Sequence, residues 1–321
     1  MKAILQDVYG PPEVLRLGDA AEPAFGPSEV LLQVHAAGID RGTAHLMRGE
    51  PYLMRVLGFG FRRPKNPVLG RDVAGTVVQA GSEVTEFHVG DEVFGIANGS
   101  FAEYAAARAD KLVGKPARLT FEEAAVVPVS STTAMQGLRD VGHVRAGQDV
   151  LIIGASGGVG TYAVQIAKAF GARVTGVCST AKVDLVRSIG ADDVIDYTRE
   201  DFADGTRRFD LVIDIGGNTH ISRLRRALEP NGTLVIVGGE GGKWTGVGRQ
   251  IRAVALSPFL RQRLAMFVNR ESHDNLEAVR QLIDTGQVSP IVDRTYPLVE
   301  VPDALRHLEA GQARGKIAIS I

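Results

Sequence analysis

Cysteine is almost absent from the chain, and long apolar runs are missing. The 321 residues include one cysteine, Cys178, so the chain can form no internal disulfide and no metal site with several cysteine ligands. No segment approaches the ~18 consecutive apolar residues of a membrane-spanning helix, and the first residues contain no apolar core of a signal peptide. We therefore expect a protein of a reducing compartment and assign it to the cytoplasm.

An excess of charge of either sign is also missing. The 36 basic and 37 acidic residues are interspersed and give a net charge of −1, so the sequence indicates no surface for a polyanion. We therefore expect neither nucleic acid nor a membrane among the partners. A hydrophobic content of 45% over this length is typical of an ordinary globular protein with room for two domains.

A glycine-rich turn is the most informative feature that the chain does contain. An apolar run begins at Asp149, and residues with helical periodicity follow Gly160. Ala155, Gly157 and Gly160 occupy the three small-residue positions of the dinucleotide-binding G-x-G-x-x-G pattern. Backbone N–H groups and the helix dipole favour a pyrophosphate at such a helix start. We predict that Ala155, Ser156, Gly157, Gly158 and Val159 bind a dinucleotide; a glycine turn without a nucleotide is the alternative.

Further runs typical of strands follow at regular spacing and alternate with helical or loop segments. This alternation predicts an α/β fold with a doubly wound parallel sheet. The predicted strands that follow the turn are Arg173–Cys178, Asp193–Tyr197, Asp210–Ile215 and Gly232–Gly238.

The residues before the turn follow a different pattern. Short alternating runs, broken by Gly, Pro and Asp, predict a rolled and mostly antiparallel β domain. Its predicted strands are Glu29–His35, Asp72–Gln79, Asp91–Ile96 and Phe101–Ala107. The predicted helices elsewhere are Leu119–Ala125, Thr132–Val141, Asn275–Thr285 and Val301–Ala310. Gly315–Ile321 is predicted as a last strand that returns to the first domain, which would make the nucleotide domain an insertion.

Several motifs in this order resemble the medium-chain dehydrogenase/reductase superfamily, and specifically its zinc-free quinone oxidoreductase branch. They are Gly38-Ile-Asp40, Pro67-Val-Leu-Gly70-Arg71-Asp72-Val-Ala-Gly75-Thr-Val, Val89-Gly-Asp-Glu-Val-Phe-Gly95, Gly154 to Gly160, and the terminal Gly315-Lys316 strand. The resemblance covers nearly the whole chain. It implies a GroES-like substrate domain of residues 1–122 and 270–321, and a Rossmann NADPH-binding domain of residues 123–269.

Zinc is expected to be absent. In the dehydrogenases of this superfamily the first two ligands of the catalytic zinc lie where this chain has Asp40 and Arg71. A guanidinium group has no lone pair for a metal, and the seven histidines show no ligand spacing. Without this Lewis acid, simple alcohol oxidation is disfavoured. Hydride transfer to a quinone or an α,β-unsaturated carbonyl needs less assistance, because the acceptor delocalises the arriving charge onto oxygen.

The end of the second strand of the nucleotide domain favours NADPH over NADH. An NAD site usually has an acidic residue there, whereas this chain has Ser179, Thr180 and Lys182. Two hydroxyls and an ammonium group suit a 2′-phosphate through charge-assisted hydrogen bonds. In the alternative interpretation Ser179 and Thr180 cap the next helix and Lys182 is solvated; both roles can coexist.

Five further residues are predicted to contact the cofactor. The resemblance places Tyr197 beside the adenosine phosphate and Thr133 near the nicotinamide, and it suggests that Lys316 also reaches the phosphate. Gly216 and Gly238 follow strands at the edge where ligands bind in open parallel sheets. The alternatives are ordinary turns for the two glycines and helix capping for Thr133.

The catalytic candidates are Tyr52, Asp40 and Thr43. Tyr52 lies where related reductases carry a tyrosine that donates a hydrogen bond or a proton to the acceptor oxygen, although a tyrosine at this place can equally be a core residue. Asp40 and Thr43 correspond to a zinc ligand and a proton-relay hydroxyl. For these two we prefer a structural interpretation in which Asp40 forms an ion pair with Arg71 at the vacated metal position.

The substrate is expected in a cleft between the domains, below two apolar segments at 48–63 and 239–248 that close over it or are fixed loops. We expect a small hydrophobic carbonyl or quinone substrate. The alternatives are an enoyl reductase acting on a carrier-bound chain and a non-catalytic NADPH-binding redox sensor. A homodimer is expected through an edge strand near Leu264–Asn269.

Overall fold

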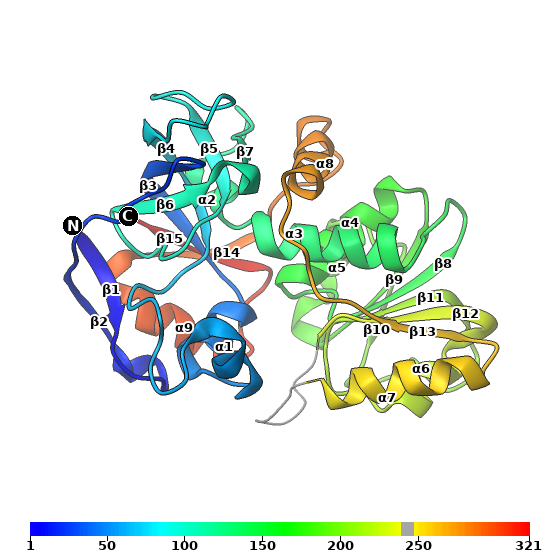
Figure 1. Ribbon diagram of the computed structural model, residues 1–321. Coiled ribbons are helices and arrows are strands. Elements are labelled where there is room, and N and C mark those ends of the chain that lie inside the picture. Colours follow the sequence, from blue (N-terminus) through cyan, green and yellow to red (C-terminus); the bar gives the residue numbers. More distant parts are fainter. Residues whose placement is uncertain (239–246) are drawn as a thin grey trace. The chain divides into compact units, whose positions relative to one another are not determined.

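A computed structural model describes residues 1–238 and 247–321 of the chain (Figure 1). Their contacts divide the described residues into two compact units. Unit 1 comprises Met1–Ser130, Glu271–Asp284 and Pro290–Ile321, and unit 2 comprises Ser131–Arg270 and Thr285–Ser289. Unit 1 therefore contains both ends of the chain, and unit 2 is inserted between its segments. No helix in the described ranges is long and apolar enough to cross a membrane.

Unit 1 is built on a seven-stranded sheet of order β14-β15-β3-β4-β5-β7, in which β6 also pairs with β3. A separate ribbon joins β1 and β2. The strands are β1 (Lys2–Gln6), β2 (Leu15–Asp19), β3 (Glu29–Ile39), β4 (Asp72–Ala80), β5 (Glu92–Ile96), β6 (Tyr104–Arg108), β7 (Leu112–Gly114), β14 (Val292–Pro297) and β15 (Lys316–Ser320). The predicted return of the last strand is confirmed, because β15 pairs antiparallel with β3.

The long strand β3 organises the core of unit 1, because its alternating side chains supply both faces of the sheet. Val30, Leu32 and Val34 contribute to one apolar cluster, whereas Ala37 and Ile39 contribute to another under α1 and α9. The helices of this unit are α1 (Arg41–Arg48), α2 (Phe121–Ala125), α8 (His273–Asp284) and α9 (Val301–Glu309), while α3 (Pro128–Met135) leads from unit 1 into unit 2.

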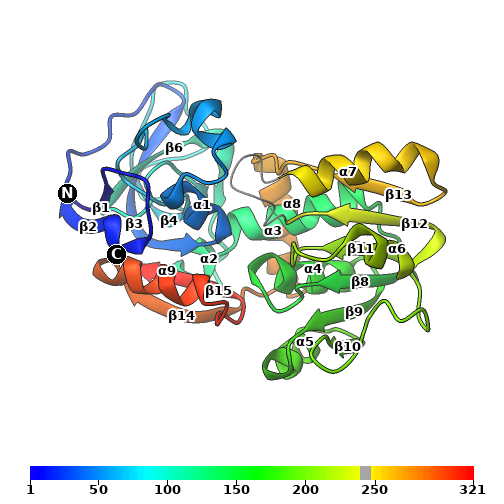
Figure 2. The same cartoon turned by 90° about the horizontal axis from the view of Figure 1, so that it is seen from below.

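Unit 2 contains a six-stranded parallel sheet of order β10-β9-β8-β11-β12-β13 (Figures 1 and 2). The strands are β8 (Asp149–Ile153), β9 (Arg173–Cys178), β10 (Asp193–Asp196), β11 (Phe209–Asp214), β12 (Leu228–Ile236) and β13 (Arg263–Met266). This is the strand order of the doubly wound dinucleotide-binding fold, in which the order of the strands reverses between β8 and β11. The predicted doubly wound sheet is confirmed.

Helices cover both faces of this sheet. They are α4 (Gly158–Ala169), α5 (Val183–Ser188), α6 (Ile221–Arg226) and α7 (Gly248–Leu256). In Figure 1, α4 lies on one face and α6 and α7 lie on the other. Leu224 of α6 and Ala253 of α7 join one buried cluster with residues of the strands. Because both faces are covered, Val150, Leu151 and Ile152 of the central strand are fully buried, which explains the unbroken apolar run in the sequence.

Candidate functional site

The glycine turn forms the strand-to-helix connection that the sequence predicts. The strand β8 ends at Ile153, Gly154 adopts a positive φ of 86°, and Gly157 lies at the N-cap of α4 in an extended conformation. The N–H of Thr161 donates to the carbonyl of Gly157, so the N–H groups of Gly158, Val159 and Gly160 precede the hydrogen-bond ladder of the helix. A pyrophosphate fits such a helix start, because these donors and the helix dipole favour an anion there.

Two glycines are required for this turn. A Cβ at Gly160 would lie 2.1 Å from the carbonyl oxygen of Gly154, and a Cβ at Gly176 of β9 would lie 3.0 Å from the Cβ of Ala155. The helix therefore packs directly on the turn, and the neighbouring strand packs on Ala155. The alanine at the first position of the pattern fits because Gly176 leaves room for its methyl group.

The residues predicted at the 2′ position lie together at the carboxyl end of β9. Ser179 is half-buried at the N-cap of the short helical turn Thr180–Lys182, and its side chain makes no capping hydrogen bond. Tyr197 follows β10, is 61% exposed, and donates its backbone N–H to the carbonyl of Cys178. The tyrosine ring and the residues after β9 therefore belong to one surface of unit 2.

A carboxylate that the sequence analysis did not consider lies at the same place. Asp196 ends β10 and lies beside Cys178 in the parallel register. Its carboxylate accepts a hydrogen bond from the hydroxyl of Thr180 at 2.5 Å, and this bond is the main reason why the pKa of Asp196 lies below its usual value. In this structure the Thr180 hydroxyl donates to Asp196, so the predicted hydrogen bond from Thr180 to a phosphate stays a prediction and would require this bond to break. The sequence places Asp196 near the end of the predicted strand Asp193–Tyr197, but only the pairing of β10 with β9 brings it beside the residues that follow β9.

Gly216 and Gly238 follow β11 and β12 at the carboxyl edge of the sheet. A Cβ on Gly238 would lie 2.3 Å from the carbonyl oxygen of Ile215, so the segments that follow the two strands are in direct contact. Arg249 of α7 joins the same segments: its guanidinium donates to Asp214 at 2.5 Å, to the Thr219 carbonyl at 2.8 Å and to the Gly238 carbonyl at 3.0 Å. Nothing in the local sequence pointed to Arg249.

Thr133 lies in the second half of α3, within unit 2, and is half-buried. Its position in the helix interior, rather than at a helix start, argues against the capping alternative. The predicted nicotinamide contact of Thr133 stays a prediction.

The predicted ion pair between Asp40 and Arg71 is wrong. The carboxylate of Asp40 caps α1 and accepts from the backbone N–H of Thr43 at 2.8 Å and from its hydroxyl at 3.0 Å. The guanidinium of Arg71 pairs instead with Glu271 at 2.7 Å, and Lys111 pairs with the same carboxylate at 3.1 Å. The donors that Asp40 finds are those of Thr43 at the start of its own helix, and the half-buried Glu271 takes Arg71 as one of its two cationic partners.

These contacts bear on the metal that many dehydrogenases of this fold hold. The two residues at the corresponding positions are a helix-capping carboxylate and an ion-paired guanidinium, and only the carboxylate is a donor of the kind that zinc binds. In the described part of the chain, no three His, Cys, Asp or Glu side chains gather in a way that could hold a metal ion. The residues present at these positions do not fit a catalytic zinc.

Lys316, which was predicted to contact the cofactor phosphate, is instead buried against Asp72 and Ser130. Lys316 is 1% exposed, and its ammonium group contacts Asp72 at 3.3 Å and the hydroxyl of Ser130 at 3.1 Å. Asp72 also accepts from the backbone N–H of Val129 at 3.1 Å. Burial raises the pKa of Asp72 to about 7. Lys316 therefore joins β15, β4 and the start of α3 inside unit 1.

Tyr52 lies beside α1 and is held by a neighbouring cation. The guanidinium of Arg55 lies 4.4 Å from the centre of the Tyr9 ring and 4.7 Å from the centre of the Tyr52 ring. The same group donates to the carbonyl of Gly49 at 2.7 Å, so its position between the rings is fixed. The half-buried Tyr52 is therefore oriented by cation–π contact.

The first predicted apolar segment forms part of the wall of a pocket in unit 1. The pocket has a volume of about 540 Å³, and Leu46, Gly58 and Phe59 come from or adjoin the segment 48–63. Val68 and Leu69 add apolar surface, and Tyr9, Asn66, Arg71 and Asn98 add polar groups. The second predicted segment lies mostly in 239–246, outside the described residues.

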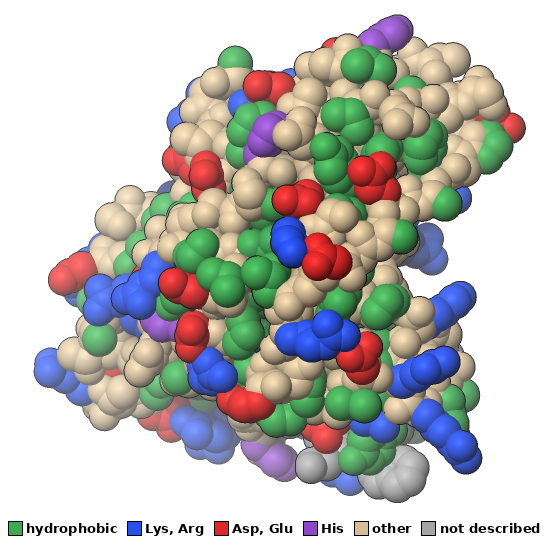
Figure 3. Space-filling model, turned by 90° about the vertical axis from the view of Figure 1, so that its left-hand side faces the viewer, with side chains coloured by type: hydrophobic (Ala, Val, Ile, Leu, Met, Phe, Trp, Pro, Cys, Tyr) green, Lys and Arg blue, Asp and Glu red, His purple; other side chains and the backbone are tan. Residues whose placement is uncertain are grey.

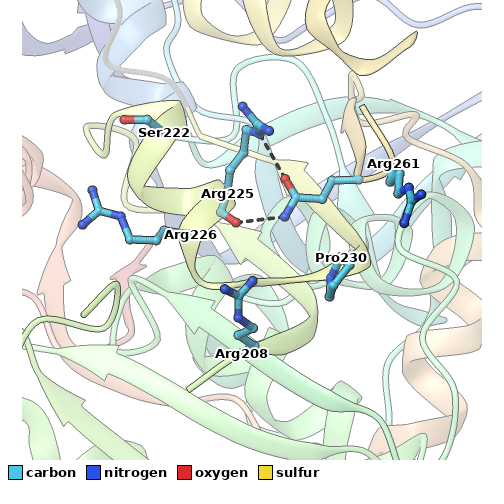
Figure 4. Close-up of a pocket in the computed structure, with 7 residues that line it drawn as sticks. Arg208, Ser222, Arg225, Arg226, Pro230 and Arg261 are labelled. Carbon is cyan, nitrogen blue, oxygen red and sulfur yellow. Dashed lines mark hydrogen bonds between the residues drawn. The ribbon is translucent and has the colours of Figure 1, made fainter. Parts of the chain in front are cut away.

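A second pocket, in unit 2, does not coincide with the dinucleotide site. It has a volume of about 390 Å³, and its lining is Arg208, Ser222, Arg225, Arg226, Pro230, Arg261 and Gln262 (Figure 4). Arg208 precedes β11 and Gln262 precedes β13, so this pocket lies at the amino ends of the strands. Arg225 is tied to Gln262 at 3.0 Å, and the side chains of Arg226 and Arg261 point in different directions. The arginines therefore form a solvated rim.

Comparisons with known proteins agree with this architecture. Residues 26–117 match the Alcohol dehydrogenase GroES-like domain family, and residues 189–319 match the Zinc-binding dehydrogenase family. The chain is 34% identical to the mitochondrial NAD(P)H oxidoreductase RTN4IP1 of Mus musculus, over 100% of this chain and 89% of that protein. It is 33% identical to the chloroplastic NADPH-dependent alkenal/one oxidoreductase of Arabidopsis thaliana, over 99% of this chain and 79% of that protein.

Solved structures give the same result. The quinone oxidoreductase from Coxiella burnetii superposes with a TM-score of 0.89 at 29% identity, covering 100% of this chain and 99% of that one. The fold expected from the resemblance, a GroES-like domain with a Rossmann-type domain, is confirmed. The chain belongs to the medium-chain dehydrogenase/reductase superfamily, in its quinone oxidoreductase-like branch.

Proposed function

We propose that this NAD(P)H-dependent oxidoreductase reduces a quinone or an α,β-unsaturated carbonyl with NADPH and without a metal. The observation that carries the proposal is the chemistry at the two zinc-ligand positions, where Asp40 caps a helix and Arg71 is paired with Glu271. Such a site offers no Lewis acid to stabilise an alkoxide, so the substrate itself must delocalise the negative charge. Quinones and conjugated carbonyls do so.

The binding of the cofactor would use unit 2 alone. The N–H groups at the start of α4 would hold the pyrophosphate, and Ser179, Lys182 and Tyr197 would surround the 2′-phosphate. The segments after β11 and β12, which Arg249 ties together, would border the nicotinamide half. When bound, NADPH supplies the hydride that the reduction requires.

The substrate would use unit 1. A pocket of about 540 Å³ with Leu46, Phe59, Val68 and Leu69 in its wall suits a small apolar acceptor. Tyr52 is not in the lining of this pocket, but its ring contacts the same guanidinium as the ring of Tyr9, which is. The phenol of Tyr52 would donate a hydrogen bond to the acceptor oxygen as charge develops there, and would supply the proton that completes the reduced product. Arg55, lying against the ring, would hold the phenol in place.

Turnover by the purified chain tests this proposal. Loss of NADPH absorbance with a panel of quinones and enones, and no gain of NADPH absorbance with simple alcohols plus NADP⁺, is the expected result. Tight NADPH binding without turnover on any acceptor would favour a redox sensor instead. Ethanol-type oxidation coupled to stoichiometric bound zinc would contradict the proposal outright.

The role of Tyr52 is tested by the variant Tyr52→Phe, with Tyr9→Phe as the matched control. Both rings lie on Arg55, so each variant keeps the cation–π contact and loses one hydroxyl. We expect kcat to fall about 100-fold for Tyr52→Phe, a typical loss for one donor to a developing oxyanion. For Tyr9→Phe, whose hydroxyl donates to the carbonyls of Phe59 in the pocket wall and of its neighbour Gly60, we expect a change in KM and little change in kcat. Full activity of Tyr52→Phe would remove this residue from the mechanism but not the reductase.

Two further assignments remain proposals. We propose a homodimer that pairs through β13, the edge strand of the parallel sheet, since exposed edges are commonly covered in this way. The cytoplasmic location stays a prediction, and the name of the Mus musculus relative places that protein in mitochondria.

A further inference from the structure

Asp196 lies at the carboxyl end of β10, beside the end of the neighbouring strand β9. The parallel pairing of β9 and β10 sets Asp196 opposite Cys178, one residue before Ser179. Asp196 is 7% exposed, whereas its chain neighbour Tyr197 is 61% exposed. The carboxylate therefore lies just beneath the surface that carries the predicted contacts to the 2′ position of the cofactor.

Two hydroxyl groups donate hydrogen bonds to the carboxylate of Asp196. Thr180 donates to one oxygen at 2.5 Å, and Thr198 donates to the other at 2.7 Å. The backbone N–H of Thr198 also donates to Asp196, at 3.0 Å. These bonds lower the pKa of Asp196, with the bond from Thr180 as the largest cause, so the group is an anion at neutral pH. A threonine hydroxyl has one proton, so Thr180 presents only acceptor lone pairs elsewhere.

The polarity of Thr180 then distinguishes the two cofactors. NADH carries a 2′-hydroxyl that can donate to a lone pair of Thr180, whereas NADPH carries a dianionic 2′-phosphate that accepts only. The anionic Asp196 also repels a phosphate. Cations partly offset that repulsion: Arg199 lies 3.5 Å from Asp196, and Lys182 lies two residues after Thr180. The site thus offers the Thr180 acceptor to the 2′-hydroxyl of NADH and the cations Lys182 and Arg199 to the 2′-phosphate of NADPH.

We propose that Asp196 sets the cofactor preference of this chain, by holding Thr180 as an acceptor for the 2′-hydroxyl of NADH and by limiting the affinity for the 2′-phosphate of NADPH. The inference rests on the proposed function for the location of the 2′ position. It leads to a chain that binds both cofactors, with a preference for NADPH that the carboxylate keeps modest.

The test is equilibrium binding of NADPH and of NADH, followed by nicotinamide fluorescence, to the full chain and to Asp196→Asn. The amide keeps the size of the side chain and an oxygen acceptor for Thr180, and it removes the charge. We expect the ratio of the NADH Kd to the NADPH Kd to rise about tenfold, because the variant removes one negative charge of the protein near the partly solvated 2′-phosphate dianion. The rise comes from tighter NADPH binding, while the NADH Kd stays nearly unchanged.

Asp193→Asn is the matched control. Asp193 begins the same strand and pairs with Arg207, so the variant removes one negative charge at the far end of β10. We expect no change in the Kd ratio. An equal rise in both variants would make the effect one of net charge, and an unchanged ratio, or weaker NADPH binding, in Asp196→Asn would overturn the proposal.

Thr180→Val gives a second and independent measurement. Loss of the hydroxyl should weaken NADH binding and leave NADPH binding almost unaltered. If NADPH binding weakens more, Thr180 donates to the phosphate and the proposal is wrong. Because these measurements follow binding without an acceptor, failure of the proposed reductase activity would show itself separately, as binding without turnover.

Discussion

At the scale of residues, the single charge of Lys182 is expected to contribute to the affinity for NADPH. It ends the short helical turn that follows β9, and it provides the ammonium group that the proposed 2′-phosphate site needs. A hydrogen bond between an ammonium group and a phosphate is stronger than one between neutral groups, because both partners are ionised. NADH lacks the phosphate and gains nothing from this bond.

We therefore expect Lys182→Ala to weaken NADPH binding by roughly tenfold or more and NADH binding only slightly. Lys168→Ala is the control, since Lys168 pairs with Asp192 near the other end of α4. Fluorescence titration of both cofactors measures the effect. An equal loss for NADH and NADPH would contradict the role of Lys182 at the phosphate.

Single residues were predictable where their positions follow from one contiguous motif. The glycines between Gly154 and Gly160 could be assigned because a strand, a turn and a helix are written in one segment. The partners of Arg71 and Lys316 could not be assigned. Arg71 pairs with a carboxylate 200 residues away, and Lys316 with one 244 residues away, so only the folded chain brings them together. Asp196 was missed because its place depends on strand register.

At the scale of elements, α1 depends on the residue that caps its start, Asp40. Asp40 supplies the acceptor for the N–H of Thr43, and Gly49 ends the helix in the left-handed conformation. We expect Asp40→Ala to lower the free energy of unfolding by about 1 kcal/mol and Asp40→Ser to preserve most of it, because serine also caps helices. Urea denaturation measures both. A serine variant that is stable but inactive would instead assign Asp40 to catalysis.

The buried pair of Asp72 and Lys316 joins β4 to β15. Removal of the cation leaves a buried carboxylate without its partner, so we expect Lys316→Met to cost about 3–5 kcal/mol of unfolding free energy. The double variant Asp72→Asn/Lys316→Met should recover much of this loss. No recovery in the double variant would mean that the cost comes from packing of the lysine chain.

The same pair makes stability depend on pH. Burial raises the pKa of Asp72 to about 7, well above the value of an exposed aspartate. The folded state therefore holds a proton that the unfolded state has lost, in the window between about pH 4 and pH 7. This contribution to stability is present below that window and is lost as the pH rises through it. Asp72→Asn should flatten that decline in urea unfolding followed across the window, and an unaltered slope would contradict this assignment.

Elements were predictable where the apolar pattern is strong. The bounds of β9 agree with the prediction, and those of β10 and β11 differ by one residue at most at each end. The strands β1, β2, β7 and β14 received no prediction. Of these, β14 carries Asp293, Arg294 and Thr295, lies at the edge of its sheet and ends in proline, so its sequence shows little of the alternation expected for a strand with one buried face.

At the scale of the whole molecule, side chains of both charges are interspersed on the surface, as Figure 3 shows for one face. Two large apolar side chains near the edge strand β13 are more exposed than those elsewhere in the described residues. Phe259 and Val268, just before and just after this strand, are 84% and 78% exposed. An open strand edge with apolar neighbours is a surface that proteins usually cover.

The proposed dimer is tested by Val268→Glu, which places a charge beside this edge. We expect light scattering to give twice the mass of the 34.2 kDa chain for the unaltered protein and a larger share of single chains for the variant. Val89→Glu is the control, because Val89 is 69% exposed between β4 and β5 of unit 1. A single-chain mass for the unaltered protein would contradict the dimer.

The division of the chain into two domains was predictable from the sequence, but the boundary between the domains was predicted less accurately. The predicted first segment of the substrate domain ends at residue 122, whereas the contacts extend unit 1 to Ser130. The physical reason is that α2 and the start of α3 belong to the core of unit 1: Ala124 and Ala125 are fully buried, and Asp72 accepts from Val129. Helical periodicity alone does not reveal which domain a helix packs against.

The pairing of β3 with β15 has a consequence for biosynthesis. At a translation rate of roughly 5–20 residues per second, the ribosome needs tens of seconds to proceed from the first of these strands to the second. Throughout that interval residues 36–39 of β3 have no permanent neighbour on the side that β15 will cover, since β6 covers only residues 29–33 there. Nearly all of unit 2 emerges during the same interval as one uninterrupted stretch. The inserted unit can thus complete its folding first, and the sheet of unit 1 is completed only after β15 has emerged from the ribosome.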